Sequence, residues 1–338
     1  MTNHLHKTII GTNLTKQLSE YLKKANLGHK YAIITDSKVE KLYGFALVRF
    51  LKNNGIKCEM FSFQEGEIAK NLKTIENLAS RMIEKGFDRK DAIIALGGGV
   101  AGDAAGFLAS IYMRGVPFIQ IPTTLLAMID SSIGGKTGVN LLEGKNLIGT
   151  FYQPKAVFID TNFLKTLPKT QIRNGLAEII KCSIIKDKKL FTIIEKELPK
   201  ILSLEPKTLN KIIRQTVAIK TKIVEKDEKE SNERMLLNYG HTYGHAIEKL
   251  SGYKLLHGYA VSIGMVLANK MAVEKKILDK KSAERIKILL IKAGLPIATM
   301  KIPTHKELSS DKKKQNDIIN FILPTKIGKA IIYKEKCL

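Results

Sequence analysis

Short apolar runs alternate with stretches of helical periodicity along roughly the first 165 residues, and this alternation constrains the fold more than any other feature. The apolar runs have the length of strands, and the stretch 73–85 repeats apolar residues at helical spacing. The runs are 31–35, 57–63, 91–96, 118–121 and 156–159. Strands that alternate with helices predict a parallel sheet covered by helices on both faces. The expected fold class is therefore α/β.

The periodicity changes after Leu167 and Pro168. From there to about residue 293 apolar residues recur mainly at helical spacing, in segments 175–186, 207–225, 238–250, 259–275 and 282–292. Residues 318–333 alternate again and predict a short hairpin around 324–328. The pattern predicts a nucleotide-binding α/β domain over residues 1–167 and a mainly α-helical domain over 168–338. Ligands are expected in the cleft between them, at the carboxyl ends of the strands.

The composition is that of an ordinary globular protein, with 44% apolar and 26% charged residues in 338. This excludes a disordered chain and a disulfide-stapled miniprotein. The three cysteines, at 58, 182 and 337, lie far apart and form no C-x-x-C pair, which favours a reducing cytoplasm. The longest apolar stretch, 92–113, is interrupted by Asp103 and five glycines, so we expect no membrane span. The first residues show no apolar signal-peptide core.

The formal net charge of +24 raises the question of nucleic-acid binding. Eight Arg stand against 48 Lys, however, and the lysines are spread along the whole chain. Trp is absent and aromatic residues make up only 7%. Base and phosphate recognition favours arginine, clustered basic faces and stacking aromatics. We therefore expect no nucleic-acid partner, although a basic surface can steer an anionic small substrate.

Residues 97–102 read G-x-G-x-x-G directly after an apolar run and before a helical pattern. Glycines let a pyrophosphate approach the backbone, and a helix N-terminus offers free N–H groups, so the segment can hold a dinucleotide. A tight strand-to-helix turn is the plain alternative. The acidic residue that usually follows about 20 positions later is missing, and the carboxylate at a strand end is Asp36, which precedes the glycines. Asp36 remains a candidate for the ribose.

Residues 130–137 nearly match the P-loop pattern G-x-x-x-x-G-K-[ST]. Asp130 replaces the first glycine, and no strand runs directly into the segment, so a P-loop is disfavoured. Lys136, and Lys145 with Asn146, still suit a phosphate. In so lysine-rich a chain, the competing interpretation for each lysine is a solvated surface charge.

His241 and His245 stand four residues apart in an expected helix, a spacing that lets two imidazoles converge on one ion. His257 begins the next apolar helix, so three of the seven histidines fall within 17 residues. Spacing alone selects His241 and His245 as ligands of a divalent metal. A carboxylate should complete the set, and the spacing leaves Glu178 and Glu248 both open.

Taken together, the motifs resemble those of the 3-dehydroquinate synthase family, over nearly the whole chain. The matching blocks are GGGVAGD at 97–103, IPTTLLAMIDSSIGGKTGVN at 121–140, KNLIGTFYQP at 145–154, GLAEIIK at 175–181, and LNYGHTYGHAIE with the HG at 257–258. The resemblance implies a homodimer with an NAD-binding α/β domain and a helical domain that binds zinc, or cobalt, and the substrate.

The resemblance also implies a site, residue by residue. The metal ligands would be Glu178, His241 and His257, so that His245 is not a ligand but lies near the leaving phosphate. The substrate positions would be Asp130, Lys136, Asn146, Lys181, Lys220, Arg234, Asn238 and His245, together with a lysine near 312–314, most closely Lys313. Arg114 matches an arginine that reaches the partner subunit's site. The NAD positions would be Asp36, Glu65, Gly66, Glu67, Lys70, Gly99, Val100, Ala101, Gly102, Asp103, Thr123, Thr124, Lys136, Lys145, Phe163, Leu164, Lys165 and Thr166.

The family's reaction, in the shikimate pathway to aromatic amino acids, converts 3-deoxy-D-arabino-heptulosonate 7-phosphate to 3-dehydroquinate and phosphate. The steps are transient oxidation by NAD, β-elimination of phosphate, return of the hydride and an intramolecular aldol closure. A dianionic phosphate and a carboxylate explain a site with several Lys and Arg. The alternatives are a sibling sugar phosphate cyclase whose substrate lacks the carboxylate, and a metal-dependent polyol dehydrogenase. Lys181 and Lys220 favour the carboxylated substrate.

Overall fold

The computed structural model describes residues 6–230, 232–304, 307–308 and 318–336. The chain divides into two compact units, Met1–Thr166 and Leu167–Leu338. This division lies one residue before the boundary that the change of periodicity predicts. Lys313 lies outside the described residues, so the structure says nothing about its place.

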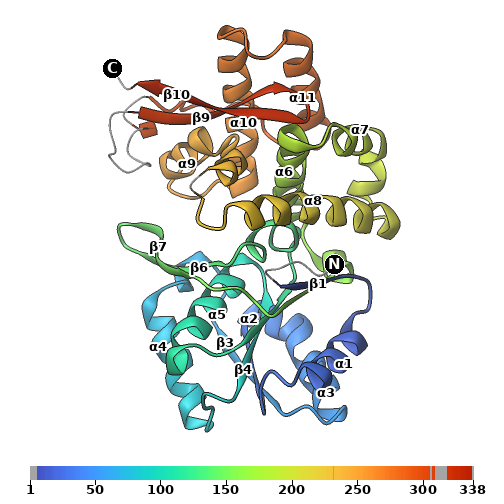
Figure 1. The fold of residues 1–338 in the computed structure, drawn as a ribbon, viewed down its shortest axis with the longest axis vertical. Coiled ribbons are helices and arrows are strands. Elements are labelled where there is room, and N and C mark those ends of the chain that lie inside the picture. The colour runs from blue at the N-terminus through green and yellow to red at the C-terminus, as the bar shows by residue number, and fades with distance from the viewer. Residues whose placement is uncertain (1–5, 231, 305–306, 309–317, 337–338) are drawn as a thin grey trace. The chain divides into compact units, whose positions relative to one another are not determined.

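The N-terminal unit is built on a six-stranded sheet of order β1-β8-β5-β4-β2-β3, in which every strand pair is parallel (Figure 1). The strands are β1 (Lys7–Gly11), β2 (Tyr31–Asp36), β3 (Cys58–Phe63), β4 (Ala92–Gly97), β5 (Phe118–Pro122) and β8 (Ala156–Asp160). The five predicted strands are confirmed. β1 was not predicted, because its five residues mix polar and apolar types and it lies at the edge of the sheet beside β8.

Two apolar cores cover the two faces of this sheet, as the parallel-sheet prediction requires. On one face α1 (Thr15–Ala25) and α3 (Phe45–Asn53) pack against β2 through Leu18, Leu51 and Ile33. On the other face α4 (Leu72–Glu84) and α5 (Gly99–Ile111) pack against Ile34. Neighbouring residues of β2 thus enter opposite cores, as the two-residue repeat of a strand dictates. The α/β fold class is confirmed for this unit.

Shorter elements connect these layers. They are α2 (Ser37–Val39), the π-helices η1 (Glu40–Gly44) and η4 (Ala127–Ser131), and the 3-10 helices η2 (Glu67–Ala69), η3 (Tyr112–Arg114) and η5 (Thr161–Thr166). An antiparallel hairpin, β6 (Lys136–Leu141) with β7 (Gly144–Phe151), was not predicted. β6 begins at Lys136, so the P-loop-like segment leads into a strand rather than a helix. This excludes a P-loop, whose phosphate site needs the helix N-terminus that follows.

The C-terminal unit is mainly helical (Figure 1). Its helices are α6 (Lys169–Lys186), α7 (Lys188–Leu202), α8 (Pro206–Lys226), the 3-10 helix η6 (Glu233–Asn238), α9 (His241–Leu250), α10 (His257–Glu274) and α11 (Lys280–Lys292). β9 (Ile318–Lys326) and β10 (Lys329–Lys336) form the predicted hairpin. α7 was not predicted, although Asp187 caps its N-terminus through Lys189 N and Leu190 N. Among the described helices, none combines the length and apolarity that a membrane crossing needs.

One predicted helix boundary is wrong in a way that matters for the site. The pattern predicts a helix from Asn238, but α9 begins at His241. Gly240 adopts φ 79°, a left-handed conformation that side chains with a Cβ rarely take and that interrupts a helix. His241 is therefore the first residue of α9, as His257 is of α10.

Candidate metal centre and nucleotide site

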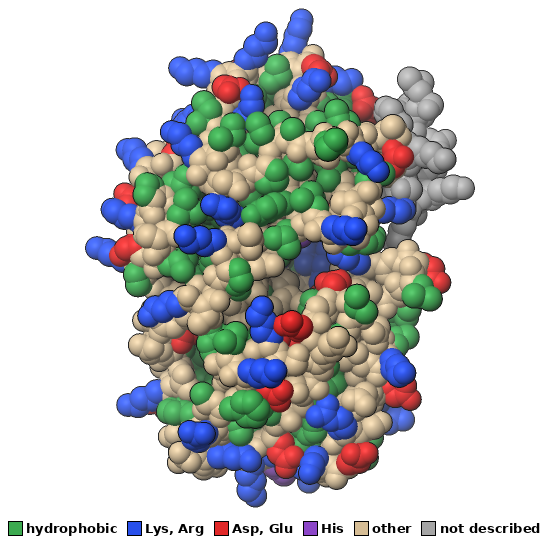
Figure 2. Space-filling model, turned by 180° about the vertical axis from the view of Figure 1, so that it is seen from behind, with side chains coloured by type: hydrophobic (Ala, Val, Ile, Leu, Met, Phe, Trp, Pro, Cys, Tyr) green, Lys and Arg blue, Asp and Glu red, His purple; other side chains and the backbone are tan. Residues whose placement is uncertain are grey.

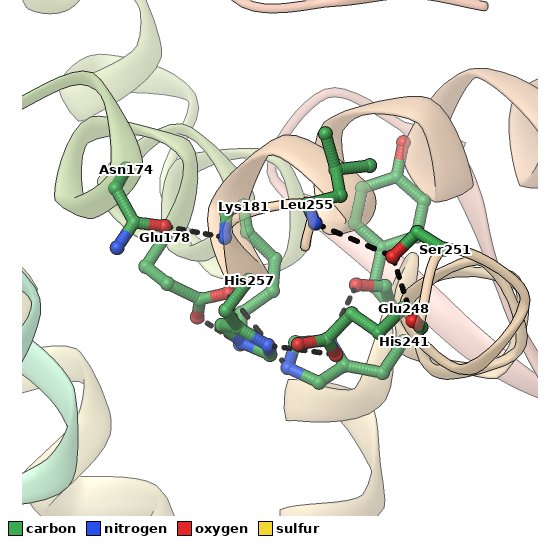
Figure 3. Close-up of polar contacts among 10 residues, drawn as sticks. Asn174, Glu178, Lys181, His241, Glu248, Ser251, Leu255 and His257 are labelled. Carbon is green, nitrogen blue, oxygen red and sulfur yellow. Dashed lines mark hydrogen bonds and ion pairs between the residues drawn. The ribbon is translucent and has the colours of Figure 1, made fainter. Parts of the chain in front are cut away.

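Helix α6 buries two charged side chains that form one ion pair. Glu178 and Lys181 are 0% and 1% exposed, and the Lys181 Nζ contacts Glu178 Oε2 (Figure 3). The two residues are three apart, so they share one face of the helix. A single buried charge would destabilise the fold strongly, whereas the pair keeps both groups charged without water. The other Glu178 oxygen, Oε1, is directed to two histidines.

The first residues of α9 and α10 bring these histidines to Glu178. His241 Nε2 lies 3.7 Å and His257 Nε2 lies 3.6 Å from Glu178 Oε1. Both separations are too long for hydrogen bonds. Neither Glu178 oxygen has a hydrogen-bond partner of normal geometry among the described residues, although both oxygens are buried. Glu178 Oε1, which faces the two rings, therefore accepts no hydrogen bond from the described residues.

In each ring Nε2 faces Glu178, and the contact that Nδ1 makes on the other side decides which of the two nitrogens carries the proton. His241 Nδ1 lies 3.2 Å from the carbonyl oxygen of Tyr239, and His257 Nδ1 lies 3.2 Å from Glu248 Oε2. A carbonyl and a carboxylate oxygen only accept, so each contact requires the proton on Nδ1. In the neutral rings the lone pair is then on Nε2, directed toward Glu178. This is the arrangement in which histidine binds a metal.

The spacing of the three ligand atoms fits a divalent ion. One carboxylate oxygen and one nitrogen from each ring lie within 4.8 Å of one another. Tetrahedral zinc bonds of about 2.0–2.2 Å place neighbouring ligand atoms about 3.3–3.5 Å apart. The observed 3.6 and 3.7 Å need only a small contraction to meet this geometry. Three protein ligands also leave a fourth position for a substrate oxygen, as in catalytic rather than structural zinc sites.

The electrostatics of the cluster favour one added positive charge. Burial raises the pKa of Glu178, but the Lys181 ammonium and the His257 ring outweigh it and lower that pKa to about 2. Burial lowers the pKa of His257, but Glu178 and Glu248 outweigh it and raise that pKa to about 10. Burial, and then Lys181, hold the pKa of His241 well below its usual value. A divalent ion would meet the demand for positive charge that otherwise falls on His257.

The structure distinguishes the histidine pair that the spacing selects, His241 with His245, from the pair that the family resemblance implies, His241 with His257. His245, Glu248 and His257 form a second candidate group, whereas no group among the described residues holds both His241 and His245. The rings of His241 and His245 lie 5.3 Å apart between centroids. The ring that faces Glu178 together with His241 therefore comes from the start of another helix, α10, and not from four residues along α9.

The remaining candidate residues of this unit lie on α8, η6 and the loop between them. Lys220 and Arg234 are 6% and 3% exposed, and the Arg234 Nη1 donates to the carbonyl oxygen of Glu228. Asn238 Nδ2 donates to Glu230 Oε1 at 2.7 Å. Glu230 was not singled out from the sequence, because it lies in a run of alternating acidic and basic residues that reads as solvated loop.

In the N-terminal unit the glycine turn lies where β4 ends and α5 begins. A Cβ on Gly97 would lie 2.6 Å from the Ala101 Cβ, and one on Gly98 would lie 3.1 Å from the Thr124 Cγ2. No side chain caps the N-terminus of α5. The turn therefore offers bare backbone N–H groups at the positive end of a helix, which fits the pyrophosphate of a dinucleotide.

The sheet order explains why the ribose candidate precedes the glycines. β2 pairs with β4, so Asp36 and Gly97 end adjacent strands. The Asp36 Oδ2 lies 3.6 Å from the position of a Cβ on Gly97, while its Oδ1 accepts from Lys38 N and Val39 N. Asp36 thus occupies in space the place that the missing downstream acid would have.

A polar network around the buried Lys70 connects several other NAD candidates. The Lys70 Nζ lies 2.5 Å from both Asp103 Oδ2 and Asn146 Oδ1. Asn140 Oδ1 accepts from Asn146 N at 2.9 Å, and Asn140 Nδ2 donates to Glu67 Oε1 at 2.8 Å. Burial raises the pKa of Asp103, and the Lys70 ammonium opposes that shift. Asn146 adopts φ 57°, and its side-chain amide contacts one candidate cofactor residue, Lys70.

Other predicted positions lie at the ends of strands or in short turns. Thr123 N donates to the carbonyl oxygen of Gly97, and the Tyr43 hydroxyl contacts Phe163 O and Thr166 Oγ1. A hollow of about 330 Å³ is lined by Ser37, Lys38, Lys41, Leu42 and Glu65, next to Asp36 in the chain.

Arg114 lies in η3 with φ 72°. Lysines and arginines are scattered over the face drawn in Figure 2 and form no single basic patch there.

Comparison with known proteins decides which family has these sites. The family model for the 3-dehydroquinate synthase N-terminal region matches residues 60–174, and the model for its C-terminal region matches 175–315. A 3-dehydroquinate synthase of Prochlorococcus marinus subsp. pastoris is 44% identical, covering 99% of this chain and 94% of that protein. The chain belongs to the 3-dehydroquinate synthase family. A Campylobacter concisus synthase is also 44% identical, over 96% of this chain and 94% of its own.

Solved structures place this synthase-family chain among sugar phosphate cyclases. The 2-epi-5-epi-valiolone synthase of Streptomyces hygroscopicus subsp. jinggangensis, with NAD⁺ and Zn²⁺ bound, matches at TM-score 0.90 and 29% identity, over 99% of this chain and 94% of that one. A 2-deoxy-scyllo-inosose synthase with carbaglucose-6-phosphate, NAD⁺ and Co²⁺ matches at 0.88 and 29%, over 97% and 93%. A probable glycerol dehydrogenase of Sinorhizobium meliloti shares only the fold, at 17% identity and TM-score 0.63 over 86% and 82%.

Proposed function

We propose that this chain is a 3-dehydroquinate synthase, a lyase that converts 3-deoxy-D-arabino-heptulosonate 7-phosphate to 3-dehydroquinate and phosphate. The observation that carries the proposal is the arrangement of Glu178, His241 and His257, whose ligand atoms lie within 4.8 Å of one another in a chain of this family. When bound, zinc or cobalt supplies Lewis acidity to neighbouring sugar hydroxyls, and NAD supplies a hydride acceptor that is restored within each turnover.

The protein's own residues then bind and orient the substrate. Lys181 compensates the charge of Glu178 and leaves a positive group beside the ion site. We assign the substrate's phosphate to a set of amides and basic groups. We assign its carboxylate to two cationic side chains, because charged hydrogen bonds bind such an anion strongly. The phosphate set is Lys136, Asn146, Asn238 and His245, and the carboxylate pair is Lys220 and Arg234. Asp130 and Lys313 complete the proposed substrate residues.

The cofactor residues follow from the sheet unit. We assign the ribose to Asp36 and the pyrophosphate to the N-terminus of α5, from Gly99 to Asp103. The support is the bare glycine turn and the adjacency of Asp36 to Gly97. Glu65–Glu67, Lys70, Thr123, Thr124, Lys136, Lys145 and Phe163–Thr166 are the further proposed contacts.

We further propose a cytoplasmic homodimer in which Arg114 reaches the partner's site. Cys58 and Cys182 are buried free thiols, which suits a reducing compartment. Size-exclusion chromatography with light scattering tests the dimer, and a monomer at micromolar concentration would contradict it. Turnover restored by mixing Arg114→Ala subunits with subunits inactive at His241 would support the assignment of Arg114.

A sibling sugar phosphate cyclase is the second candidate, because solved relatives at 29–30% identity include such enzymes. Their substrate class lacks the carboxylate that Lys220 and Arg234 would bind. The two candidates therefore differ in which substrate is turned over, the carboxylated heptulosonate phosphate or a ketose phosphate without the acid.

Phosphate release tests the proposal directly. Purified protein should release phosphate from the heptulosonate phosphate only with both NAD⁺ and a divalent ion, and a chelator should stop it. Absorbance at the NADH band should not accumulate, since the hydride returns in each turnover. Steady NADH formation would indicate a dehydrogenase, and release from only the substrate without the acid would indicate a sibling cyclase.

A further inference from the structure

Glu248 lies on the side of His257 away from Glu178 and is neither a proposed ligand nor a proposed substrate residue. It follows His241 and His245 at positions i+7 and i+3 of α9, so the three side chains share one helix face. Glu248 is only 7% exposed, and its Oε2 lies 3.2 Å from His257 Nδ1 (Figure 3). A carboxylate so well buried needs a reason to be kept.

We propose that Glu248 is a positioning residue that sets the affinity of the metal centre by holding the Nδ1 proton of His257. The inference rests on the proposed metal role of Glu178, His241 and His257. A carboxylate that accepts from Nδ1 fixes the ring's tautomer and angle, and it increases the electron density on the ligating Nε2. Glu248 therefore acts on the ion through His257, without touching it.

The backbone on both sides of His257 is held by hydrogen bonds, so the side-chain rotation of His257 is what Glu248 can fix. The next residue is tied to α6, because Gly258 N donates to Asn174 Oδ1 at 2.6 Å. The preceding loop is tied to α9, because Ser251 Oγ donates to the carbonyl oxygen of Glu248 at 2.7 Å and accepts from Leu255 N at 3.3 Å. With the Cα of His257 held from both sides, rotation about its side-chain bonds remains. The Glu248 contact selects one rotation.

The other ligand ring provides an internal contrast. His241 Nδ1 faces the main-chain carbonyl of Tyr239, which no side-chain substitution removes. His257 Nδ1 faces a side chain that can be removed. A change at Glu248 should therefore disturb one ligand ring and leave the other in place.

Zinc affinity, measured at equilibrium against a chromophoric chelator, tests the proposal without any substrate. Glu248→Ala should weaken zinc binding about 10- to 100-fold, the range found for such partners, while the stoichiometry stays at one ion per chain. Glu248→Gln keeps an acceptor oxygen but not the charge, so its loss should be smaller. Glu274→Ala removes an exposed carboxylate from α10 and should bind zinc as the unsubstituted chain does. His257→Ala should lose the ion.

Binding within twofold of the unsubstituted chain in both Glu248 variants would overturn the proposal. A stoichiometry that falls from two ions to one in Glu248→Ala would also overturn it, since Glu248 would then be a ligand in the group with His245 and His257. Thermal melts with excess zinc check that the variants fold. If the alanine variant does not fold, Glu248→Gln alone decides, with a weakened affinity expected and an unchanged one contradicting.

Proton spectra of the cobalt(II)-loaded protein report the contact itself. The unsubstituted chain should show two exchangeable, strongly shifted Nδ1–H signals, one for each ligand histidine. Glu248→Ala should lose one of them to exchange with water, whereas persistence of both would contradict the proposal. These readouts need no turnover, so a chain that binds metal in this way yet releases no phosphate would refute only the proposed function.

Discussion

A buried lysine pairs with a carboxylate in each unit of this protein, and the two pairs are completed differently. In the sheet unit, the Lys70 ammonium lies 2.5 Å from Asp103 and also 2.5 Å from the amide oxygen of Asn146. In the helical unit, Lys181 contacts one oxygen of Glu178, and the other oxygen faces two imidazole nitrogens at 3.6 and 3.7 Å. The first pair is satisfied by protein groups alone. The second leaves a carboxylate oxygen and two ring nitrogens within 4.8 Å of one another, which suits a cation.

This difference separates a lysine–carboxylate pair that is completed by an amide from one that faces two imidazole nitrogens. A buried ion pair is weak evidence of function by itself, because networks that only hold the fold also perturb pKa values. What distinguishes Glu178 is the pair of rings whose other nitrogens are already engaged, by Tyr239 and Glu248. The lone pairs that remain converge on one point. The following substitutions probe the two pairs and the groups around them.

The largest effect is expected from removing a ring of the metal centre. His241→Ala should leave the protein without stoichiometric zinc and lower phosphate release at least about 1,000-fold, because several kcal/mol of charge stabilisation are lost. Metal analysis and phosphate release measure the two effects. Full zinc content in this variant would show that the ion lies elsewhere.

His245→Ala should give the next largest effect and a different pattern. It should keep zinc within about threefold while turnover falls roughly 100- to 10,000-fold, the usual range for a lost proton-transfer group. The same two measurements apply, so this variant is the matched control for His241→Ala. Loss of zinc here would favour the ligand pair that the spacing of four residues suggests.

Lys70→Met tests the pair in the sheet unit. Asp103, whose side chain is 19% exposed, would lose its cation, which should destabilise that unit by about 1–3 kcal/mol. Zinc affinity should not change, since the three proposed ligands all belong to the other unit. Urea unfolding, followed separately for the two units, measures the loss. The double variant with Asp103→Asn should recover a large part of it, and no recovery would mean that the ion pair is not the cause.

The smallest effect is expected at Tyr239, whose hydroxyl donates to Asn269 Oδ1 at 2.6 Å inside the helical unit. Tyr239→Phe should destabilise this unit by about 1–3 kcal/mol, because Asn269 loses a buried donor. Zinc affinity should change little, since the carbonyl that holds His241 belongs to the main chain. Tyr243→Phe is the control, because its hydroxyl donates to a weak acceptor, Met271 Sδ, at 3.8 Å. Equal losses in both variants would contradict the account.

The sequence predicts the sheet better than the site, for physical reasons. Strands buried on both faces read as continuous apolar runs, so β2, β4 and β5 are visible without a partner. The edge strand β1 and the hairpin β6–β7 are not, because they alternate weakly. The proposed ligands depend on where helices begin, since Gly240 interrupts the helical pattern and α9 starts at His241. The choice between Glu178 and Glu248 depends on which nitrogen of His257 each carboxylate faces. Residue spacing carries none of that information, which the family resemblance supplied.

The central claim is that Glu178, His241 and His257 together hold one divalent ion. The most direct measurement is an anomalous difference map, recorded at the zinc edge from crystals of the zinc-loaded protein. The account predicts one peak about 2.0–2.2 Å from Glu178 Oε1, His241 Nε2 and His257 Nε2. A peak instead at His257 Nδ1, shared with His245 and Glu248, or no peak at either group, would contradict it.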